Sequence, residues 1–343
     1  MKALRVHSKE NLSLDEVLTP TPGDGQVLIR MAYAGICGSD LHYYFDGANG
    51  AFVVKEPLIP GHEVSGTVEA DPSGRLAPGT PVTVHPARFG TPDEAYGRHL
   101  WPGGSYLGSA STWPHTQGGM SEYLLVEDFM VVQIPDGLSL EAAALAEPLA
   151  VGLHGINRAG DLTGQKVLVS GSGPIGLLAA AGALSRGAAE VWATDLLDGP
   201  LARADALGVH RTVRVDQEAL PEHFFDVVLE CTGIPAAVNA AFEAARRGGT
   251  LVQIGMMGAG PQPIALATAI AKEVSILPSF RFDDEIGEAL DILRARPEIA
   301  DIVVTHVVSA DDAEQAFALA RNSAESGKVL VDLWTEAGQS DGS

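Results

Sequence analysis

The chain contains few cysteines and no long apolar run. Cys37 and Cys231 are the only cysteines among its 343 residues. Because a secreted protein of this size usually carries more of them, we expect a reducing, cytoplasmic environment. No run of about 18 apolar residues occurs, so no membrane span is expected. The first residues read as a short strand rather than as a signal peptide.

Basic residues are also scarce. The sequence has 22 Lys and Arg against 44 Asp and Glu, which gives a formal net charge of -22. Nucleic acids and anionic membranes bind basic surfaces, so neither is expected as a partner. The 46% of apolar residues, with 39 Gly and 21 Pro, describe a compact and loop-rich protein, and the length predicts two domains.

Two kinds of pattern follow one another along the chain. Short strands separated by turns come first and suggest a small β-barrel; the clearest cover residues 26–34, 62–69 and 80–85. Residues 139–147 then predict a helix, and a second helix is expected after Pro148. From residue 166 onward, apolar strands alternate with Ala-rich helical segments. This alternation predicts an α/β fold whose doubly wound parallel sheet is covered on both faces.

A glycine-rich turn predicts a dinucleotide site. Gly171-Ser172-Gly173-Pro174-Ile175-Gly176 follows a strand and opens a helix, and Asp195 ends the next strand. The glycines allow the backbone to approach a pyrophosphate, which then faces the N–H groups and positive dipole end of the helix. Asp195 would accept hydrogen bonds from both hydroxyls of the adenosine ribose. A structural turn that binds no nucleotide is the poorer alternative.

The surroundings of Asp195 favour NAD over NADP. Asp198 lies close by, and the next basic residue is Arg203, so a 2′-phosphate would meet negative charge. Two later strand ends lie on the same rim of the sheet, where ligands of such folds bind. From this placement we expect cofactor contacts from three further residues, Thr232, Ile254 and Gly255. Cys231 is expected to be a small buried residue.

Metal-ligand side chains occur in two segments near the start of the chain. Cys37, His62 and Glu63 supply a thiolate, an imidazole and a carboxylate, which are zinc ligands. A lone Cys or His is more often packed than bound to metal, so the interpretation depends on the combination. Ser39 and His42 follow the thiolate and are candidates to carry a proton away. Their alternatives are an N-cap and an exposed helix residue.

These motifs together resemble the zinc-dependent medium-chain dehydrogenases. The motifs are Gly35-Ile36-Cys37-Gly38-Ser39-Asp40-Leu41-His42, Gly61-His62-Glu63-Val64-Ser65-Gly66, Ala146-Glu147-Pro148-Leu149-Ala150 and the glycine turn. Glu147 indicates the polyol, or sorbitol-type, branch, because the alcohol-dehydrogenase branch usually has a cysteine there. The resemblance implies three parts: a GroES-like catalytic domain over residues 1–149 with 280–335 returning to it, a Rossmann NAD-binding domain over 150–279, and a flexible tail at 336–343.

The resemblance also implies hydride transfer between NAD and a secondary alcohol. Cys37, His62 and Glu63 would bind zinc, and Glu147 would bind it directly or through water. Whether Glu63 or Glu147 is the inner ligand stays open. The proton would leave through Ser39 and the cofactor ribose toward His42, with Glu147 as the third catalytic residue. Two more cofactor contacts are implied, Ser279 and Phe280.

Finer similarities favour a sugar acid such as L-idonate as the substrate. Four segments resemble enzymes acting on L-idonate more than sorbitol dehydrogenases: Tyr106–Ala110, Trp113–His115, Gly118-Gly119 and Ser279–Phe282. Arg281, supported by His115 or Arg88, is the candidate partner of the substrate carboxylate. A salt bridge from Arg281 to Asp283 or Asp284 is the alternative. Tyr43 and Tyr106 either line the sugar site or pack.

Two alternatives to a zinc-dependent sugar-acid dehydrogenase are considered. A neutral polyol such as sorbitol or xylitol is the nearest alternative substrate. A zinc-free, reductase-like or purely nucleotide-binding relative would bind no metal and would tolerate Cys37→Ser. The intact set of four candidate ligands argues against that second alternative.

One feature of the family is missing. Its members usually hold a second, structural zinc with four closely spaced cysteines, but residues 87–107 contain none. We therefore expect one zinc per chain. That lobe would be held by aromatic packing, through Phe89, Tyr96, Trp101 and Tyr106. The family implies a homo-oligomer, a dimer or tetramer.

Overall fold

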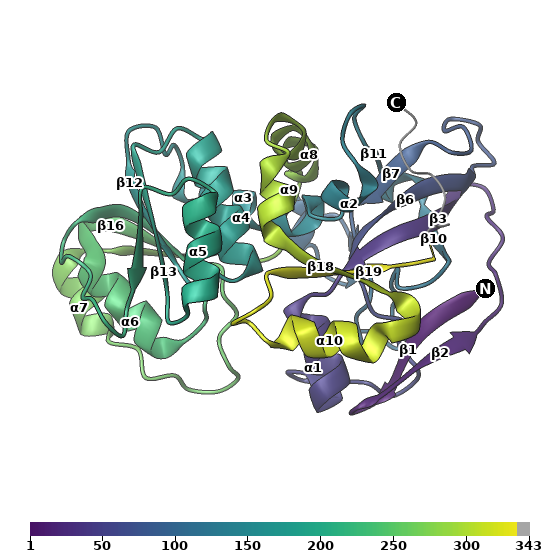
Figure 1. Cartoon of the computed structure of the whole chain (residues 1–343), viewed down its shortest axis with the longest axis horizontal. Helices are drawn as coiled ribbons and strands as arrows, with labels where there is room; N and C mark the ends of the chain where they lie inside the picture. The colour runs from purple at the N-terminus through teal and green to yellow at the C-terminus, as the bar shows by residue number, and fades with distance from the viewer. Residues whose placement is uncertain (335–343) are drawn as a thin grey trace. The chain divides into compact units, whose positions relative to one another are not determined.

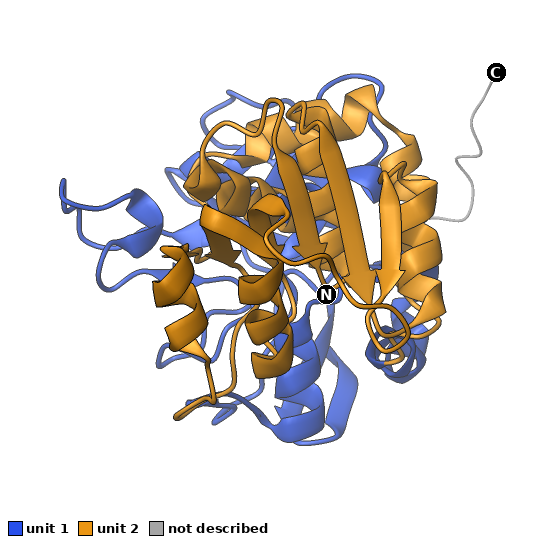
Figure 2. Cartoon of the chain, turned by 90° about the vertical axis from the view of Figure 1, so that its left-hand side faces the viewer, with its two compact units in different colours: residues 1–147, 306–321, 328–343 blue, residues 148–305, 322–327 orange. Residues whose placement is uncertain are grey.

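The computed structural model describes residues 1–334, which form two compact units (Figures 1 and 2). Among the described residues, unit 1 comprises 1–147, 306–321 and 328–334, and unit 2 comprises 148–305 and 322–327. The flexible tail expected at 336–343 lies outside the described residues. No helix among residues 1–334 is long and apolar enough to cross a membrane.

Unit 1 is organised around strand β3 (Gln26–Gly35). On one side β3 pairs antiparallel with β6 (Glu63–Ala70). It also pairs with β10 (Tyr123–Glu127) at its start and with β19 (Lys328–Asp332) at its end. The sheet continues from β6 through β7 (Pro81–Val84) to β11 (Val131–Gln133), and from β19 to β18 (Val304–Ser309). A distant C-terminal strand therefore lies directly beside the end of β3.

The remaining helices and strands of unit 1 include three strands of this sheet, β7, β11 and β18, and the elements outside it. They are β1 (Lys2–Ser8), β2 (Asn11–Glu16), α1 (Gly38–Asp46), β4 (Ala48–Asn49), β5 (Phe52–Val53), β7 (Pro81–Val84), β8 (Ala87–Arg88), β9 (Ser105–Tyr106), β11 (Val131–Gln133), α2 (Leu140–Ala143), β18 (Val304–Ser309) and α10 (Ala313–Arg321). Short 3-10 turns cover residues 98–100, 128–130 and 310–312. Apolar residues of β1, β3, β6, α1, α10 and β19 form one buried core.

Unit 2 contains a six-stranded parallel sheet, which confirms the predicted α/β class. Its order is β14-β13-β12-β15-β16-β17, so the direction of winding changes between β12 and β15. The strands are β12 (Lys166–Ser170), β13 (Glu190–Asp195), β14 (Arg211–Arg214), β15 (Phe225–Glu230), β16 (Ala245–Gln253) and β17 (Ser275–Pro278). The edge strand β17 was not expected. It is only four residues long and largely exposed, so it lacks the continuous apolar run of the inner strands.

Helices accompany this sheet. They are α3 (Ala146–Ala159), α4 (Pro174–Ser185), α5 (Asp198–Ala206), α6 (Pro235–Ala244), α7 (Leu266–Lys272), α8 (Ile286–Ala295) and α9 (Glu298–Val303). Residues 280–305 were expected in the first domain, but they belong to unit 2. The reason is packing, since α9 contacts both α4 and α5 and buries Ile299 and Val303.

The helical segment around Pro148 differs from the prediction. Helix α2 ends at Ala143, and α3 begins at Ala146, before the proline rather than after it. Pro148 therefore lies in the first turn of α3, where backbone N–H groups have no partner within the helix. This start places Glu147 at a helix N-terminus, next to Pro148.

The lobe after β7 is held by fewer aromatic residues than expected. The ring of Phe89 stacks on that of Phe129 at 6.2 Å and meets the edge of Trp101 at 6.3 Å. Tyr96 is 56% exposed, and the hydroxyl of Tyr106 is directed to Glu147 instead. The expectation that Tyr96 packs within the lobe is therefore wrong, whereas Tyr106 is buried and pairs with Ala87 of β8, and the ring of Phe129 joins the packing.

Candidate active site

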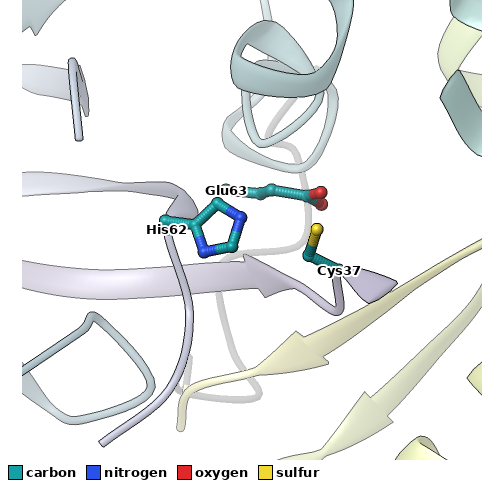
Figure 3. A group of neighbouring side chains, drawn as sticks. All are labelled: Cys37, His62 and Glu63. Atoms are coloured by element: carbon teal, nitrogen blue, oxygen red, sulfur yellow. The ribbon is translucent and has the colours of Figure 1, made fainter. Parts of the chain in front are cut away.

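Cys37, His62 and Glu63 converge in unit 1 (Figure 3). Cys37 is the N-cap of α1, just after β3, whereas Glu63 opens β6 and lies opposite Gly35 in the antiparallel ladder. One potential ligand atom from each of the three residues lies within 4.8 Å of the others. The pairing of β3 with β6 thus brings together residues that the sequence separates.

Gly35 leaves room for the carboxylate of this cluster. A Cβ atom at Gly35 would lie 2.2 Å from Oε2 of Glu63, closer than any real contact. Glycine is therefore required at the end of β3 if the Glu63 side chain is to keep its place. The glycines around Cys37 thus serve the carboxylate as well as the thiolate.

Asp40 joins the two ligand-bearing loops, and the sequence analysis did not identify it. Its Oδ2 accepts the N–H of Cys37 at 2.9 Å, and its Oδ1 accepts the N–H of Gly61 at 3.2 Å. The side chain is fully buried; burial raises the pKa of the carboxyl, while His62 and the two amides oppose that shift. An acidic residue three positions after an N-cap is a capping signal that points to it.

Lys328 is the second residue that was missed. Its Nζ lies 2.7 Å from Oε1 and 2.5 Å from Oε2 of Glu63, and donates to Ile36 O at 3.1 Å. Both side chains of the ion pair are buried. Burial alone would lower the pKa of Lys328, but Glu63 and then Cys37 outweigh it and raise that pKa. No local signal predicts this pair, because β19 joins the sheet from the far end of the chain.

Glu147 lies near the cluster but outside the group of three ligand atoms. It accepts the hydroxyl hydrogen of Tyr106 at 2.6 Å. Burial is the main reason that its pKa is raised, and His62 opposes that shift while Glu63 adds to it. The ring of Tyr106 also meets the edge of His62, with centroids 5.4 Å apart. Tyr106 is thus a bridge between Glu147 and the cluster.

The surroundings of His62 fit a bound cation. Its Nδ1 is buried, and none of the described residues forms a hydrogen bond with it. Burial opposes protonation of the ring, but the charges of Cys37, Asp40 and Glu147 outweigh it and raise the pKa of His62 well above normal. A positive charge is therefore stabilised here. Together with the thiolate and carboxylate, these features suit Zn²⁺.

Ser39 and His42 lie on α1, immediately after Cys37. Three residues apart, they share one side of the helix. Ser39 is half-buried, whereas the side chain of His42 is 61% exposed and its Nδ1 lies 2.9 Å from Oδ2 of Asp46. Ser39 therefore lies close to Cys37 along the chain, and His42 lies at the surface, in contact with solvent.

Two of the candidate substrate residues in unit 1, Tyr43 and His115, are engaged in contacts away from the group of three ligand atoms. Tyr43 is 1% exposed within the core of unit 1, and its hydroxyl oxygen accepts the N–H of Ala110. His115 uses both ring nitrogens, with Thr112 O at 2.9 Å and Lys55 N at 2.9 Å. It lines a groove of about 570 Å³ whose lining residues do not include Cys37, His62 or Glu63.

Two arginines were considered for the substrate carboxylate. Arg88, in support, forms an ion pair with Glu127 at 2.7 Å. Arg281 belongs to unit 2, has a left-handed φ of 54° and lies 4.8 Å from the centre of the Phe280 ring. The backbone at Arg281 is thus held in a conformation that costs free energy.

The glycine turn of unit 2 is tightly packed. Gly171 has a φ of 90°, and a Cβ atom at Gly176 would lie 1.8 Å from the carbonyl oxygen of Gly171. Gly173 is the N-cap of α4, and a Cβ atom there would meet nothing within 4 Å. Its neighbour Pro174 occupies the first turn. The helix therefore presents an open N-terminus, as binding of a pyrophosphate requires.

Asp195 is oriented by the same turn. Its Oδ2 accepts the N–H of Ser172 at 2.9 Å, and its Oδ1 accepts the N–H of Leu196 at 2.7 Å. The carboxylate is thus fixed at the end of β13, beside the glycine turn. Arg203, the nearest basic residue in sequence, donates to the carbonyl oxygens of Ser323, Glu325 and Ser326.

The other expected cofactor residues lie at the ends of neighbouring strands. Thr232 follows β15, Ile254 and Gly255 follow β16, and Ser279 and Phe280 follow β17. A Cβ atom at Gly255 would lie 2.4 Å from the N atom of Gly233, so these loops are in close contact. Since parallel strands end at one edge of the sheet, the expected residues share one rim. Burial, and next Glu230, raise the pKa of the Cys231 thiol.

Comparisons with known proteins agree with both halves of this description. The family model described as an alcohol dehydrogenase GroES-like domain matches residues 23–136, and that of a zinc-binding dehydrogenase matches residues 174–295. Sorbitol dehydrogenase of Gallus gallus is 36% identical over 333 residues, 92% of either chain. L-idonate 5-dehydrogenase (NAD(P)(+)) of Escherichia coli is 34% identical over 296 residues, 84% of this chain and 86% of its own.

Solved structures show the same similarity. The crystal structure of L-idonate 5-dehydrogenase from Escherichia coli superposes with a TM-score of 0.91 and 31% identity. The match covers 96% of this chain and 97% of that one. Galactitol-1-phosphate dehydrogenase from Escherichia coli matches with a TM-score of 0.86 and 28% identity, over 97% of this chain and 100% of the other.

Proposed function

The chain belongs to the polyol branch of the zinc-dependent medium-chain dehydrogenases, and from that premise we propose that it oxidises L-idonate to 5-keto-D-gluconate with NAD. Membership confirms the resemblance and the fold class predicted from the sequence. It also makes the protein an oxidoreductase that acts on an alcohol CH–OH group with zinc and an NAD(H)-type cofactor. The observation that carries the finer proposal is the similarity to L-idonate 5-dehydrogenase over 96% of the chain.

In this proposal unit 1 is the catalytic domain. Cys37, His62 and Glu63 would hold one zinc ion, and Glu147 would contribute as a ligand, directly or through a water molecule. When bound, zinc supplies a Lewis acid that lowers the pKa of the substrate hydroxyl. Lys328 neutralises Glu63, so the thiolate and Glu147 are left to balance the two positive charges of the ion.

Ser39 and His42 move the proton. The Ser39 hydroxyl accepts it from the substrate hydroxyl while donating its own proton to the cofactor ribose, and the ribose passes a proton on to His42, which is exposed and hydrogen-bonded to Asp46. An exposed imidazole exchanges protons readily with water near neutral pH. The positions of both residues on α1 support this route. Tyr106 orients Glu147, and Tyr43 and His115 have structural contacts of their own.

Unit 2 is the NAD-binding domain of the proposal. The pyrophosphate approaches Gly171, Gly173 and the N-terminus of α4, and Asp195 receives the adenosine ribose. Thr232, Ile254, Gly255, Ser279 and Phe280 border the rest of the cofactor. The preference for NAD is supported by Arg203, whose guanidinium group is bound to backbone carbonyl groups rather than available for a 2′-phosphate.

Arg281 is proposed as the partner of the substrate carboxylate. The left-handed backbone at Arg281 and the contact of its guanidinium group with the Phe280 ring define the position of that group in unit 2. Arg281→Ala should reduce kcat/KM for L-idonate far more than for sorbitol, because only the former carries a carboxylate. Steady-state kinetics with both substrates measure this difference, and equal losses would contradict the role.

A substrate screen with metal analysis tests the proposal as a whole. Purified protein is assayed with L-idonate, D-gluconate, sorbitol, xylitol and L-threonine, each with NAD and NADP. We expect the highest kcat/KM with L-idonate and NAD, one zinc per chain, and loss of zinc in Cys37→Ser. A higher kcat/KM with sorbitol or xylitol would establish the polyol alternative. Two zinc ions per chain would contradict the single-site proposal.

Two further expectations belong to the proposal. A homo-oligomer, dimer or tetramer, is expected from the family, and light scattering on the purified chain measures it. The cytoplasmic location is supported by the two free cysteines, Cys37 and Cys231. Cell fractionation with an antibody to the chain tests it.

A further inference from the structure

Glu230, the last residue of β15, carries a buried carboxylate at the rim that the proposed cofactor occupies. The side chain is 0% exposed. Its Oε1 accepts the N–H of Thr232 at 2.9 Å and also the hydroxyl hydrogen of Thr232. Its Oε2 accepts the N–H of Gly233 at 2.9 Å and the side-chain amide of Gln253 at 2.5 Å. The carboxylate therefore holds the loops after β15 and β16 together.

The charge of Glu230 is not balanced by a cation. All four donors are neutral: two backbone N–H groups, one hydroxyl and one amide. None of the ion pairs formed by residues 1–334 involves it. Each of the four partners donates to the carboxylate oxygens, and a buried charge acts over a longer distance than one in water. This contrasts with Glu63 in unit 1, which is paired with Lys328.

The topology of the sheet decides which half of the dinucleotide lies near Glu230. Asp195 on β13 receives the adenosine ribose, and the glycine turn after β12 receives the pyrophosphate. Because β15 and β16 lie on the other side of β12, the nicotinamide half extends over the ends of these two strands. Ser170, just before the glycine turn, pairs with Glu230 in the sheet.

We propose that Glu230 makes the site selective for the oxidised cofactor, an inference that depends on the proposed NAD-binding function of unit 2. The nicotinamide ring of NAD⁺ carries a positive charge, whereas that of NADH is neutral. The field of an unbalanced buried carboxylate therefore stabilises bound NAD⁺ and leaves bound NADH nearly unaffected. Glu230 would thus favour the form of the cofactor that accepts a hydride.

Equilibrium binding to the full-length zinc-loaded chain tests this inference. The Kd values of NAD⁺ and NADH are measured by calorimetry and by NADH fluorescence, with ADP-ribose as a ligand that lacks nicotinamide. Glu230→Gln should raise the ratio Kd(NAD⁺)/Kd(NADH) on the order of five- to tenfold, because the charge is lost. Glu230→Asp should keep the ratio, because it disturbs the same loops but retains the charge.

A second variant keeps the loops and cancels the charge. Gln253→Lys places an ammonium group where the amide now donates to Glu230, so it should raise the ratio in the same direction. It also decides the question if Glu230→Gln does not fold. A ratio unchanged in both variants, or equal weakening of NAD⁺, NADH and ADP-ribose, would assign Glu230 a purely structural role. Wild-type protein that binds none of the three ligands would instead overturn the proposed function itself.

Discussion

The metal cluster of unit 1 and the cofactor rim of unit 2 are built by different means. The cluster and its immediate neighbours bring together polar and charged side chains, most of them buried, from four distant segments: Cys37, His62 with Glu63, Glu147 and Lys328. The rim consists mainly of glycines and backbone groups that approach one another closely, as Gly176 approaches Gly171. Charge balance stabilises the cluster of unit 1, whereas close steric fit stabilises the rim of unit 2.

This difference predicts different responses to mutation. In a buried charged cluster, removal of one partner leaves an uncompensated charge. A glycine turn is insensitive to charge, but a single methyl group is enough to block it. The following substitutions test the two behaviours, in order of decreasing expected effect.

Gly176→Ala tests the tightest contact of the cofactor rim. The added Cβ atom would lie 1.8 Å from the carbonyl oxygen of Gly171, which is backbone and has little freedom to move. We expect a loss of about 5 kcal/mol or more in the free energy of unfolding, measured by urea denaturation. The matched control is Gly173→Ala, whose Cβ atom meets nothing within 4 Å. It should keep its stability within about 1 kcal/mol but lose NAD affinity. Equal stability of both variants would refute the steric account.

Lys328→Met tests charge balance in the metal cluster. Without its partner, Glu63 is a buried charge in a site that contains two further acidic groups. The free energy of unfolding should fall by about 3–5 kcal/mol. The double variant Lys328→Met/Glu63→Gln should regain much of that loss. Arg294→Met is the control, because its ion pair with Asp291 is exposed and should be worth about 0.5 kcal/mol or less. A Lys328→Met protein as stable as wild type would show that charge balance between Lys328 and Glu63 does not stabilise the cluster.

Glu285 is an exception to the steric fit that characterises unit 2. Its charged side chain forms hydrogen bonds with the loop that carries Arg281. It lies 2.8 Å from Nδ1 of His154 and accepts the N–H groups of Asp283 and Asp284. Burial acts to raise its pKa, but the hydrogen bonds from His154 and Asn157 outweigh it and lower that pKa to about 2.

A carboxyl group with a lowered pKa stabilises the folded state above its unfolded pKa and loses that contribution as the pH falls toward the folded value. Wild type should therefore exceed Glu285→Gln by up to about 3 kcal/mol at pH 7. The difference should shrink as the pH falls from about 4.5 toward about 2. Urea unfolding of both proteins across this range measures it. A difference that does not change with pH would mean that the carboxylate charge plays no part.

Tyr106→Phe should have the smallest effect. It removes one hydrogen bond to Glu147 and leaves the ring that meets His62. We expect a loss of about 1–2 kcal/mol in the free energy of unfolding, with zinc still bound. Tyr96→Phe in the exposed part of the same lobe should change the stability by less than about 0.5 kcal/mol. Loss of zinc in Tyr106→Phe would show that the hydroxyl orients a ligand that the ion requires.

Local sequence signals were sufficient for some parts of the protein. The glycine turn, Asp195 and the apolar strands that alternate with helices indicated the parallel sheet and its ligand-binding rim. They did so because a tight turn and a continuous buried strand impose residue types at short range. The motifs around Cys37 and His62 indicated a metal site because a thiolate, an imidazole and a carboxylate form a zinc ligand set.

Tertiary structure alone decided the rest. Lys328 reaches Glu63 because β19 pairs with β3, and the two residues are 265 positions apart. The hydroxyl of Tyr106 turns to Glu147 rather than into its own lobe, and α8 and α9 pack with unit 2 rather than with unit 1. The type of a single residue could not indicate these contacts. The partner of a buried charge depends on which distant strands pair with one another. The sequence by itself determined which chemical groups are present, and the pairing of distant strands determined which of them compensate one another.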